Sequence, residues 1–159
     1  MRRALVVLSL PLAPSCAAVQ ERDPELVGDW TVVGVLDERR IDGVGVQYRH
    51  YPLAWNLVPM VGFVGSAVNK TAYTYAGLHY PIDLGERWRL SPSFAAGYFD
   101  SKGGLALGGA LEFRSGIELN YLLNKEWRLG AALTHISNGN LYDFNPGTEA
   151  FHLSLHYLF

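Results

Sequence analysis

Cysteine is nearly absent from this sequence, since Cys16 is the only one among 159 residues. A chain with a single cysteine cannot form an internal disulfide or a cysteine cluster that binds zinc. The patterns HExxH and CxxC and the glycine-rich phosphate loop are also missing. We therefore expect no metal, nucleotide or other cofactor.

Charge is sparse as well. Charged residues make up 18% of the chain and the net charge is −2, whereas about a quarter of the residues are charged in a typical soluble domain. The chain has no basic surplus that could bind a phosphate backbone, so nucleic acid is not an expected partner.

No apolar run is long and unbroken enough for a transmembrane helix. The best candidate, residues 51–68, is interrupted by Pro52, Asn56, Pro59 and several glycines, and glycine and proline break helices. Aromatic and β-branched residues are frequent on both sides. We therefore expect strands throughout, with no substantial helix after the N-terminal segment.

Residues 1–18 have the pattern of a removable signal peptide. Arg2 and Arg3 precede a short apolar core, and the small residues of "SCAA" offer a cleavage site near Ala17 or Ala18. Residues 19–159 would then be the mature domain, exported to the bacterial envelope. Lipidation of Cys16 is an alternative, which its poorly matching "APSC" context disfavours.

The strongest positive signal is alternation of apolar and polar residues with a period of two. Between residues 105 and 121 the odd positions are mostly apolar, whereas the even positions include Glu112, Arg114 and Glu118. Similar alternation recurs along the chain. The expected strands are about eight in number, at residues 29–37, 41–51, 54–65, 71–82, 87–99, 105–121, 126–137 and 149–159.

Alternating segments of about ten residues, separated by short turns, are typical of transmembrane barrels, whereas strands of about five or six residues are usual in soluble sandwiches. The last strand also ends on an aromatic residue, Phe159, which resembles the assembly signal of bacterial outer-membrane barrels. We therefore predict an all-β fold, an eight-stranded antiparallel transmembrane β-barrel of the bacterial outer membrane.

A barrel of about eight strands has a lumen that side chains just fill. We expect charged residues there to pair, because an unpaired buried charge is costly, and this argues against a pore. A solvated sheet face is the alternative. The residues expected to point inward are Arg87, Arg89, Glu112, Arg114, Glu118 and Arg128.

On the last strand, His152, Ser154 and His156 share one face. A metal site is one interpretation of this group. Hydrogen-bonded packing inside the lumen is the other, and the lack of any metal-binding motif favours it.

Three polar residues interrupt stripes that are otherwise apolar. His135 and Ser137 continue the apolar face of residues 126–137, and Glu149 begins the apolar face of the last strand. Both termini of such barrels are periplasmic, so the loop at 138–148 is extracellular and the three residues lie near the outer membrane surface. A basic residue facing lipid costs about 2–4 kcal/mol at the midplane and about 0–1 kcal/mol near the interface. Polar groups within a membrane are candidates for function.

These positions also permit a catalytic triad. His135 and Ser137 leave the same face about 7 Å apart along the strand. If Ser137 lies opposite Glu149, then Glu149 is diagonal to His135, about 7–8 Å away, which long side chains can bridge. His135 could then accept the Ser137 proton while Glu149 orients the imidazole. Asn138, Asn145 and backbone amides of the glycine-containing loop are candidate oxyanion donors.

The run "HISN", followed by "NPGTE" with Glu149 fourteen residues after His135, closely resembles the lipid A 3-O-deacylase family, the PagL-type acyloxyacyl hydrolases. Members of that family are outer-membrane barrels that remove the 3-O-linked acyl chain of lipid A with a Ser-His-Glu triad and no metal. The resemblance implies that Ser137 is the nucleophile, His135 the general base and Glu149 the orienting carboxylate. Asn138 and Asn145 match the asparagines of the motif, and Asn145 is the better oxyanion-hole candidate.

Lipid A, as part of lipopolysaccharide, is then the expected substrate. A phospholipase or acyltransferase of the same membrane is one alternative, and a non-catalytic small barrel is another, although its outer loops would usually be longer. The preferred acyl chain, the regulation and the oligomeric state, for which a homodimer is one option, are left open by the sequence.

Overall fold

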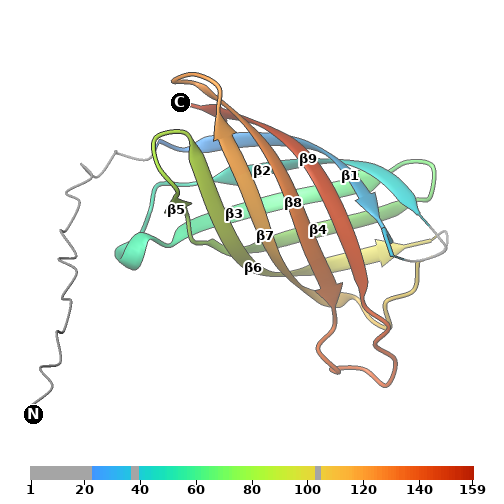
Figure 1. Ribbon diagram of the computed structural model, residues 1–159. Helices are drawn as coiled ribbons and strands as arrows, with labels where there is room; N and C mark the ends of the chain where they lie inside the picture. The colour runs from blue at the N-terminus through green and yellow to red at the C-terminus, as the bar shows by residue number, and fades with distance from the viewer. Residues whose placement is uncertain (1–22, 37–39, 103–104) are drawn as a thin grey trace, which may run out of the picture.

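The computed structural model describes residues 23–36, 40–102 and 105–159, and these form a closed antiparallel β-barrel (Figure 1). Long strands that follow one another in the chain pair in the sheet, and the first strand pairs with the last to close the barrel. The long strands are β1 (Glu25–Val33), β2 (Ile41–Arg49), β3 (Val58–Ser66), β4 (Thr71–His79), β6 (Trp88–Ser101), β7 (Leu111–Leu122), β8 (Trp127–Ser137) and β9 (Thr148–Leu158).

Two short elements complete the structure. A 3-10 turn at Ala54–Asn56 follows β2, and a two-residue strand, β5 (Ile82–Asp83), pairs with the start of β6. Within the described residues, no helix has the length and apolar character needed to cross a membrane. The expected signal peptide and Cys16 lie outside the described residues.

The predicted fold, with eight long strands, is confirmed, but three of the expected strands are displaced. The first strand is Glu25–Val33 rather than 29–37, and the third begins at Val58, after the 3-10 turn, rather than at residue 54. The strand expected from residue 105 begins at Leu111. Gly108 has a φ of 98°, a left-handed conformation that ends the extended chain.

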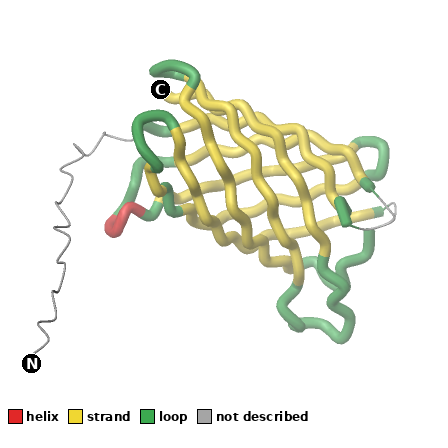
Figure 2. The backbone as a smooth tube through the Cα atoms, viewed as in Figure 1, coloured by secondary structure: helices red, strands yellow, loops and turns green. Residues whose placement is uncertain are grey.

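The barrel wall separates an apolar exterior from a mixed interior. Large apolar side chains on the outer face are open to the surroundings, for example Leu133 at 56% and Leu155 at 44% exposure. So much exposed apolar surface is typical of a protein whose strands face lipid. Figure 2 shows the strands as a continuous wall and the loops gathered at its two ends.

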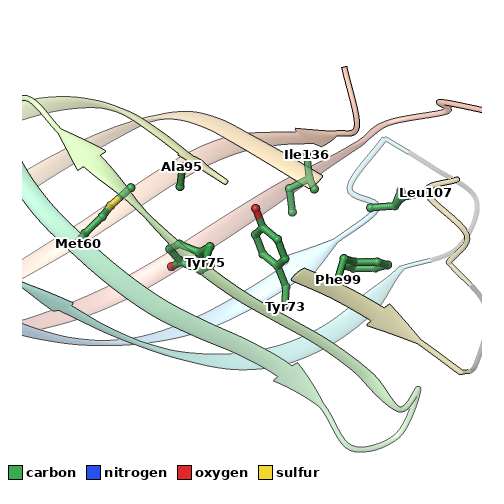
Figure 3. Packing of buried hydrophobic residues seen from close by; sticks show 7 residues of the cluster. All are labelled: Met60, Tyr73, Tyr75, Ala95, Phe99, Leu107 and Ile136. Atoms are coloured by element: carbon green, nitrogen blue, oxygen red, sulfur yellow. The ribbon is translucent and has the colours of Figure 1, made fainter. Parts of the chain in front are cut away.

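Apolar and aromatic side chains fill part of the lumen (Figure 3). Tyr73 and Tyr75 stack with their ring centroids 5.2 Å apart, and Leu107 reaches in from the loop between β6 and β7 with 2% exposure. The cluster comprises Met60, Tyr73, Tyr75, Ala95, Phe99, Leu107 and Ile136.

Buried charges occupy the lumen toward the end where the termini lie. Glu25 is central, because its carboxylate meets Arg49 at 3.5 Å, Arg89 at 3.4 Å and Arg128 at 3.3 Å. Arg49 also meets Glu118 at 2.7 Å. Of the residues expected to pair inside the barrel, Arg89, Arg128 and Glu118 do so. Their partners Glu25 and Arg49 were not among the residues expected from the sequence.

Three of the expected interior residues behave differently. Arg87 is exposed, and its guanidinium lies 6.0 Å from the Tyr121 ring centroid. Arg114 is buried with its guanidinium 4.9 Å from the centroid of the Tyr75 ring, a cation–π contact, and its charge also acts on the Asp29 carboxylate. Glu112 is fully buried, and neither of its carboxylate oxygens meets a hydrogen-bond partner among the described residues.

Candidate active site

The residues suggested by the sequence gather where β8 ends and β9 begins. Figure 1 shows the loop between these strands projecting from the end of the barrel opposite the C-terminus. Ser137 is the last residue of β8, and Glu149 is the second residue of β9. His135 is exposed and lies on the same outer face as Leu133. The prediction that these polar residues lie on apolar outward stripes is confirmed.

The strand register places His135 directly opposite Glu149. The sequence analysis took the case in which Ser137 lies opposite Glu149, and the observed register differs from that case by two residues. Opposed residues have Cβ atoms about 4.5–5.5 Å apart, closer than the diagonal pair expected from the sequence. The side chains meet, with His135 Nδ1 lying 3.2 Å from Glu149 Oε1, and both remain close to half exposed.

This contact defines the chemistry available to the imidazole. A carboxylate accepts hydrogen bonds, so Nδ1 of His135 carries the shared proton. Nε2 is then the ring atom that can accept a proton from a hydroxyl. An imidazole oriented by a carboxylate is the base of nucleophilic triads.

Ser137 lies two residues beyond His135 on the same outward face, paired with Phe113 of β7. The described part of the chain shows no hydrogen bond between the Ser137 hydroxyl and the imidazole, so the structure brings together His135 and Glu149 but not Ser137. Such contacts are often long in unliganded enzymes and tighten when substrate binds. The serine is half-buried.

Gly147 also shapes the site, although the sequence did not single it out. Its φ is 63°, and a Cβ built there would lie 2.9 Å from Cε1 and 3.3 Å from Nε2 of His135. The imidazole therefore lies against the bare backbone of this glycine. The "PG" pair just before a strand is a turn signal, but only the structure shows that the turn faces the histidine.

The two candidate oxyanion residues have different roles in the loop. Asn138 is fully buried, and its Nδ2 donates to the carbonyl oxygens of Leu107 at 2.8 Å and Phe144 at 2.9 Å. Its backbone N–H donates to Asn145 Oδ1 at 3.1 Å. Asn145 Nδ2 donates to Asn140 at 3.0 Å, which uses one of its two amide hydrogens. Asn145 can therefore still donate to a ligand, whereas the side chain of Asn138 joins two loops.

Apolar side chains surround the polar group. Phe113, beside Ser137, stacks on Phe94 with ring centroids 5.9 Å apart and an interplanar angle of 17°. Phe94 is 58% exposed. The outer wall beside the serine is therefore apolar on the side of β6 and β7.

A second Ser-His-Glu arrangement lies inside the barrel. Ser154 Oγ is 2.9 Å from His156 Nε2, and His156 Nδ1 is 3.1 Å from Glu25 Oε2. Its hydrogen bonds are better formed than those of the outer group, yet His156 is fully buried and Ser154 is 4% exposed. The adjoining lumen cavity measures about 20 Å³, about enough for one water molecule. No lipid can enter, so the inner group is part of the packing.

Comparisons with known proteins agree with this architecture. A family model described as lipid A 3-O-deacylase (PagL) matches residues 42–158. The crystal structure of the outer membrane enzyme PagL aligns with a TM-score of 0.61 at 15% identity, over 83% of this chain and 97% of that chain. No curated protein matches by sequence.

Other solved barrels share the fold. The N-terminal barrel domain of Pseudomonas aeruginosa OprF aligns with a TM-score of 0.65 at 14% identity, over 88% of this chain and 100% of that chain. Neisserial surface protein A aligns with a TM-score of 0.53 at 10% identity, over 86% of this chain and 96% of that chain. At these identities the solved structures establish the fold, while the family model, which spans β2 to β9, establishes the family. This chain therefore belongs to the lipid A 3-O-deacylase (PagL) family and is a barrel of the bacterial outer membrane.

Proposed function

We propose that this chain is a lipid A 3-O-deacylase that acts as a serine esterase on lipopolysaccharide in the outer leaflet. The contact between His135 and Glu149 on the outer wall, with Ser137 on the same face, is the observation that supports the proposal most strongly. Polar groups at this position face lipid, and a site facing lipid is suited to a substrate that is itself a membrane lipid. Family membership supports the same substrate.

In the proposed reaction, the Ser137 hydroxyl oxygen attacks the carbonyl carbon of the 3-O-linked ester. Its proton passes to Nε2 of His135, while Glu149 steadies the charged imidazolium through Nδ1. The tetrahedral intermediate carries its negative charge on the former carbonyl oxygen. The remaining amide hydrogen of Asn145 is the donor we assign to that oxygen.

Collapse of the intermediate breaks the bond to the sugar oxygen, which takes the proton from His135 and leaves as the free hydroxyl of lipid A. The acyl group stays on Ser137 as an ester. Water then attacks the carbonyl carbon of this ester and gives a proton to His135. The bond from that carbon to Ser137 Oγ breaks, the serine oxygen takes the proton back from His135, and the fatty acid leaves. All three groups come from one chain, so the chemistry needs no second subunit.

The fold alone does not assign this activity, because OprF and the neisserial surface protein share it. The test is mass spectrometry of lipid A from cells that express the chain or its Ser137→Ala variant at equal levels. We expect loss of one acyl group only when Ser137 is present. Ser154→Ala is the matched control, since it removes the serine of the inner group and should leave deacylation intact.

Two other results would redirect the proposal. Unchanged lipid A with a folded barrel in the outer membrane would exclude this substrate, and phospholipid hydrolysis dependent on Ser137 would then indicate a phospholipase. Identical lipid profiles with and without Ser137, for every lipid class, would indicate a non-catalytic barrel.

A further inference from the structure

Four polar residues, three of them buried and one half-buried, lie on the lumen side of the wall, behind the candidate site. Asp29 and Thr31 belong to β1, His152 to β9 and Thr134 to β8, so the group bridges three neighbouring strands. Thr31, Thr134 and His152 are each at most 5% exposed. We call these four residues the lumen bracket.

His152 is the centre of the lumen bracket, and both of its ring nitrogens are engaged. Nδ1 lies 2.8 Å from Thr31 Oγ1 and 3.1 Å from Asp29 Oδ1, while Nε2 lies 3.0 Å from Thr134 Oγ1. Thr31 also donates to Asp29. One imidazole therefore ties β9 to the strand on each side of it.

Thr134 is held on its other side as well. It is paired with Gly116 of β7, and a Cβ at that glycine would lie 2.7 Å from Thr134 Cγ2. The methyl group therefore rests on a glycine backbone while the hydroxyl meets His152. A side chain fixed at both ends has one position, and it fixes the backbone of β8 from which it projects.

The lumen bracket lies directly behind the site. Thr134 precedes His135 in the chain, and its cross-strand partner Ala150 follows Glu149. The bracket is thus one residue, about 3.3 Å, from the opposed pair along the strands. His135 and Glu149 lie within three residues of their strand ends, where pairing is most easily lost, and meet at 3.2 Å.

We propose that His152 and Thr134 are positioning residues that hold the ends of β8 and β9 in register, so that His135 and Glu149 stay in contact. This inference rests on the proposed function for its kinetic consequence. The lumen bracket does not touch substrate, and its effect passes through the backbone to the opposite face of the same two strands.

The test compares Thr134→Val with Thr134→Ser in purified, folded protein. Valine keeps the shape of threonine but removes the hydroxyl that meets His152. We expect kcat for lipid A deacylation to fall about tenfold, since a misplacement of about 1 Å can cost about a hundredfold. KM should change by less than about twofold, because substrate contacts are untouched. Serine restores the hydroxyl and should restore kcat.

A spectroscopic readout makes the test independent of turnover. The imidazole ¹⁵N resonances of His135, assigned with a His135→Gln variant, report its hydrogen bond to Glu149. We expect them to shift in Thr134→Val and to stay unchanged in Thr134→Ser. Ser154→Ala is the matched control. Ser154 lies opposite Asp29, but its hydrogen bonds go to Glu118 and His156, so the substitution removes no hydrogen bond of the lumen bracket and should change neither readout.

Unchanged kcat and an unchanged His135 spectrum in folded Thr134→Val would overturn the inference. If Thr134→Val does not fold, Thr31→Val removes the other hydroxyl on His152 and the same two readouts decide. If the unmodified protein shows no deacylation, the proposed function fails, while the His135 spectrum still decides whether the lumen bracket positions the pair.

Discussion

Substitution of Gly147 by alanine should lower activity more than its effect on stability explains. The residue has a φ of 63°, and a left-handed conformation costs a residue with a Cβ about 1–2 kcal/mol. The new methyl carbon would also lie 2.9 Å from His135 Cε1, whereas ordinary contact begins at 3.4 Å. The imidazole must therefore move by about 0.5 Å.

That displacement is enough to matter. His135 Nδ1 and Glu149 Oε1 are 3.2 Å apart, at the long end of the range for such hydrogen bonds, about 2.7–3.2 Å. A displacement of about 0.5 Å away from Glu149 would break the contact and free the ring to rotate. Because a misplacement of about 1 Å can cost about a hundredfold in rate, we expect kcat to fall about tenfold.

The assay is deacylation of lipid A by purified protein, with stability measured by urea unfolding in lipid vesicles. Gly139→Ala is the matched control, since Gly139 also has a φ of 63° but its Cβ would meet only Phe113, at 3.4 Å. Both variants should lose similar stability, about 1–2 kcal/mol, and only Gly147→Ala should lose most of its activity. Equal kcat values in the two variants would refute the reasoning that ties Gly147 to the imidazole.

Three further substitutions test other parts of the structure. Asn145→Ala should lower kcat about 10²–10³-fold by removing an oxyanion donor. Asn140→Gly removes only the loop acceptor of Asn145 and should lower kcat far less. Equal losses of kcat in the two variants would assign Asn145 to loop structure. Glu149→Gln should lower kcat by up to about 10⁴-fold with the barrel intact, because an amide can hold the imidazole in the wrong tautomer; near-normal turnover would exclude Glu149 from the mechanism. Glu25→Ala should lower the free energy of unfolding, measured in urea, by about 3–5 kcal/mol, because it removes the carboxylate that three buried arginines share. An unchanged unfolding midpoint would show that other groups compensate the lumen charges.

Much of the fold and the location of the site could be predicted from the alternation of apolar and polar residues along each strand. Side chains alternate along a strand, so the apolar run from Trp127 to Leu133 fixes which face His135 and Ser137 share without any knowledge of the partner strand. The same reasoning placed Glu118 and Arg128 inside the barrel, where they are found. The reasoning was wrong for Arg87. This residue precedes β6, which begins at Trp88, and outside a strand alternation does not decide which way a side chain points.

Register could not be obtained in the same way. The loop between β8 and β9 determines whether Glu149 lies opposite His135 or Ser137, since a shift of two residues preserves parity and every apolar stripe. The loop conformation depends on Asn138, whose side chain reaches the carbonyl oxygens of Leu107 and Phe144. Leu107 in turn belongs to a sequence segment that alternates like a strand, but in the structure it lies outside the strands and packs inside the barrel. Contacts between distant loops set this geometry, and a local pattern does not contain them.

The two Ser-His-Glu groups show why hydrogen-bond geometry alone does not identify an active site. The inner group, at Ser154, has both of its contacts formed, whereas the outer group, at Ser137, has one. Burial favours the outer group as the active site. The inner serine is enclosed by ion pairs, with space for about one water molecule, whereas the outer serine lies on an apolar outer wall. The inner group binds no substrate, so all of its hydrogen bonds can form within the folded protein. A site that admits an ester must leave the serine hydroxyl free to approach it, and the incomplete outer group fits that requirement.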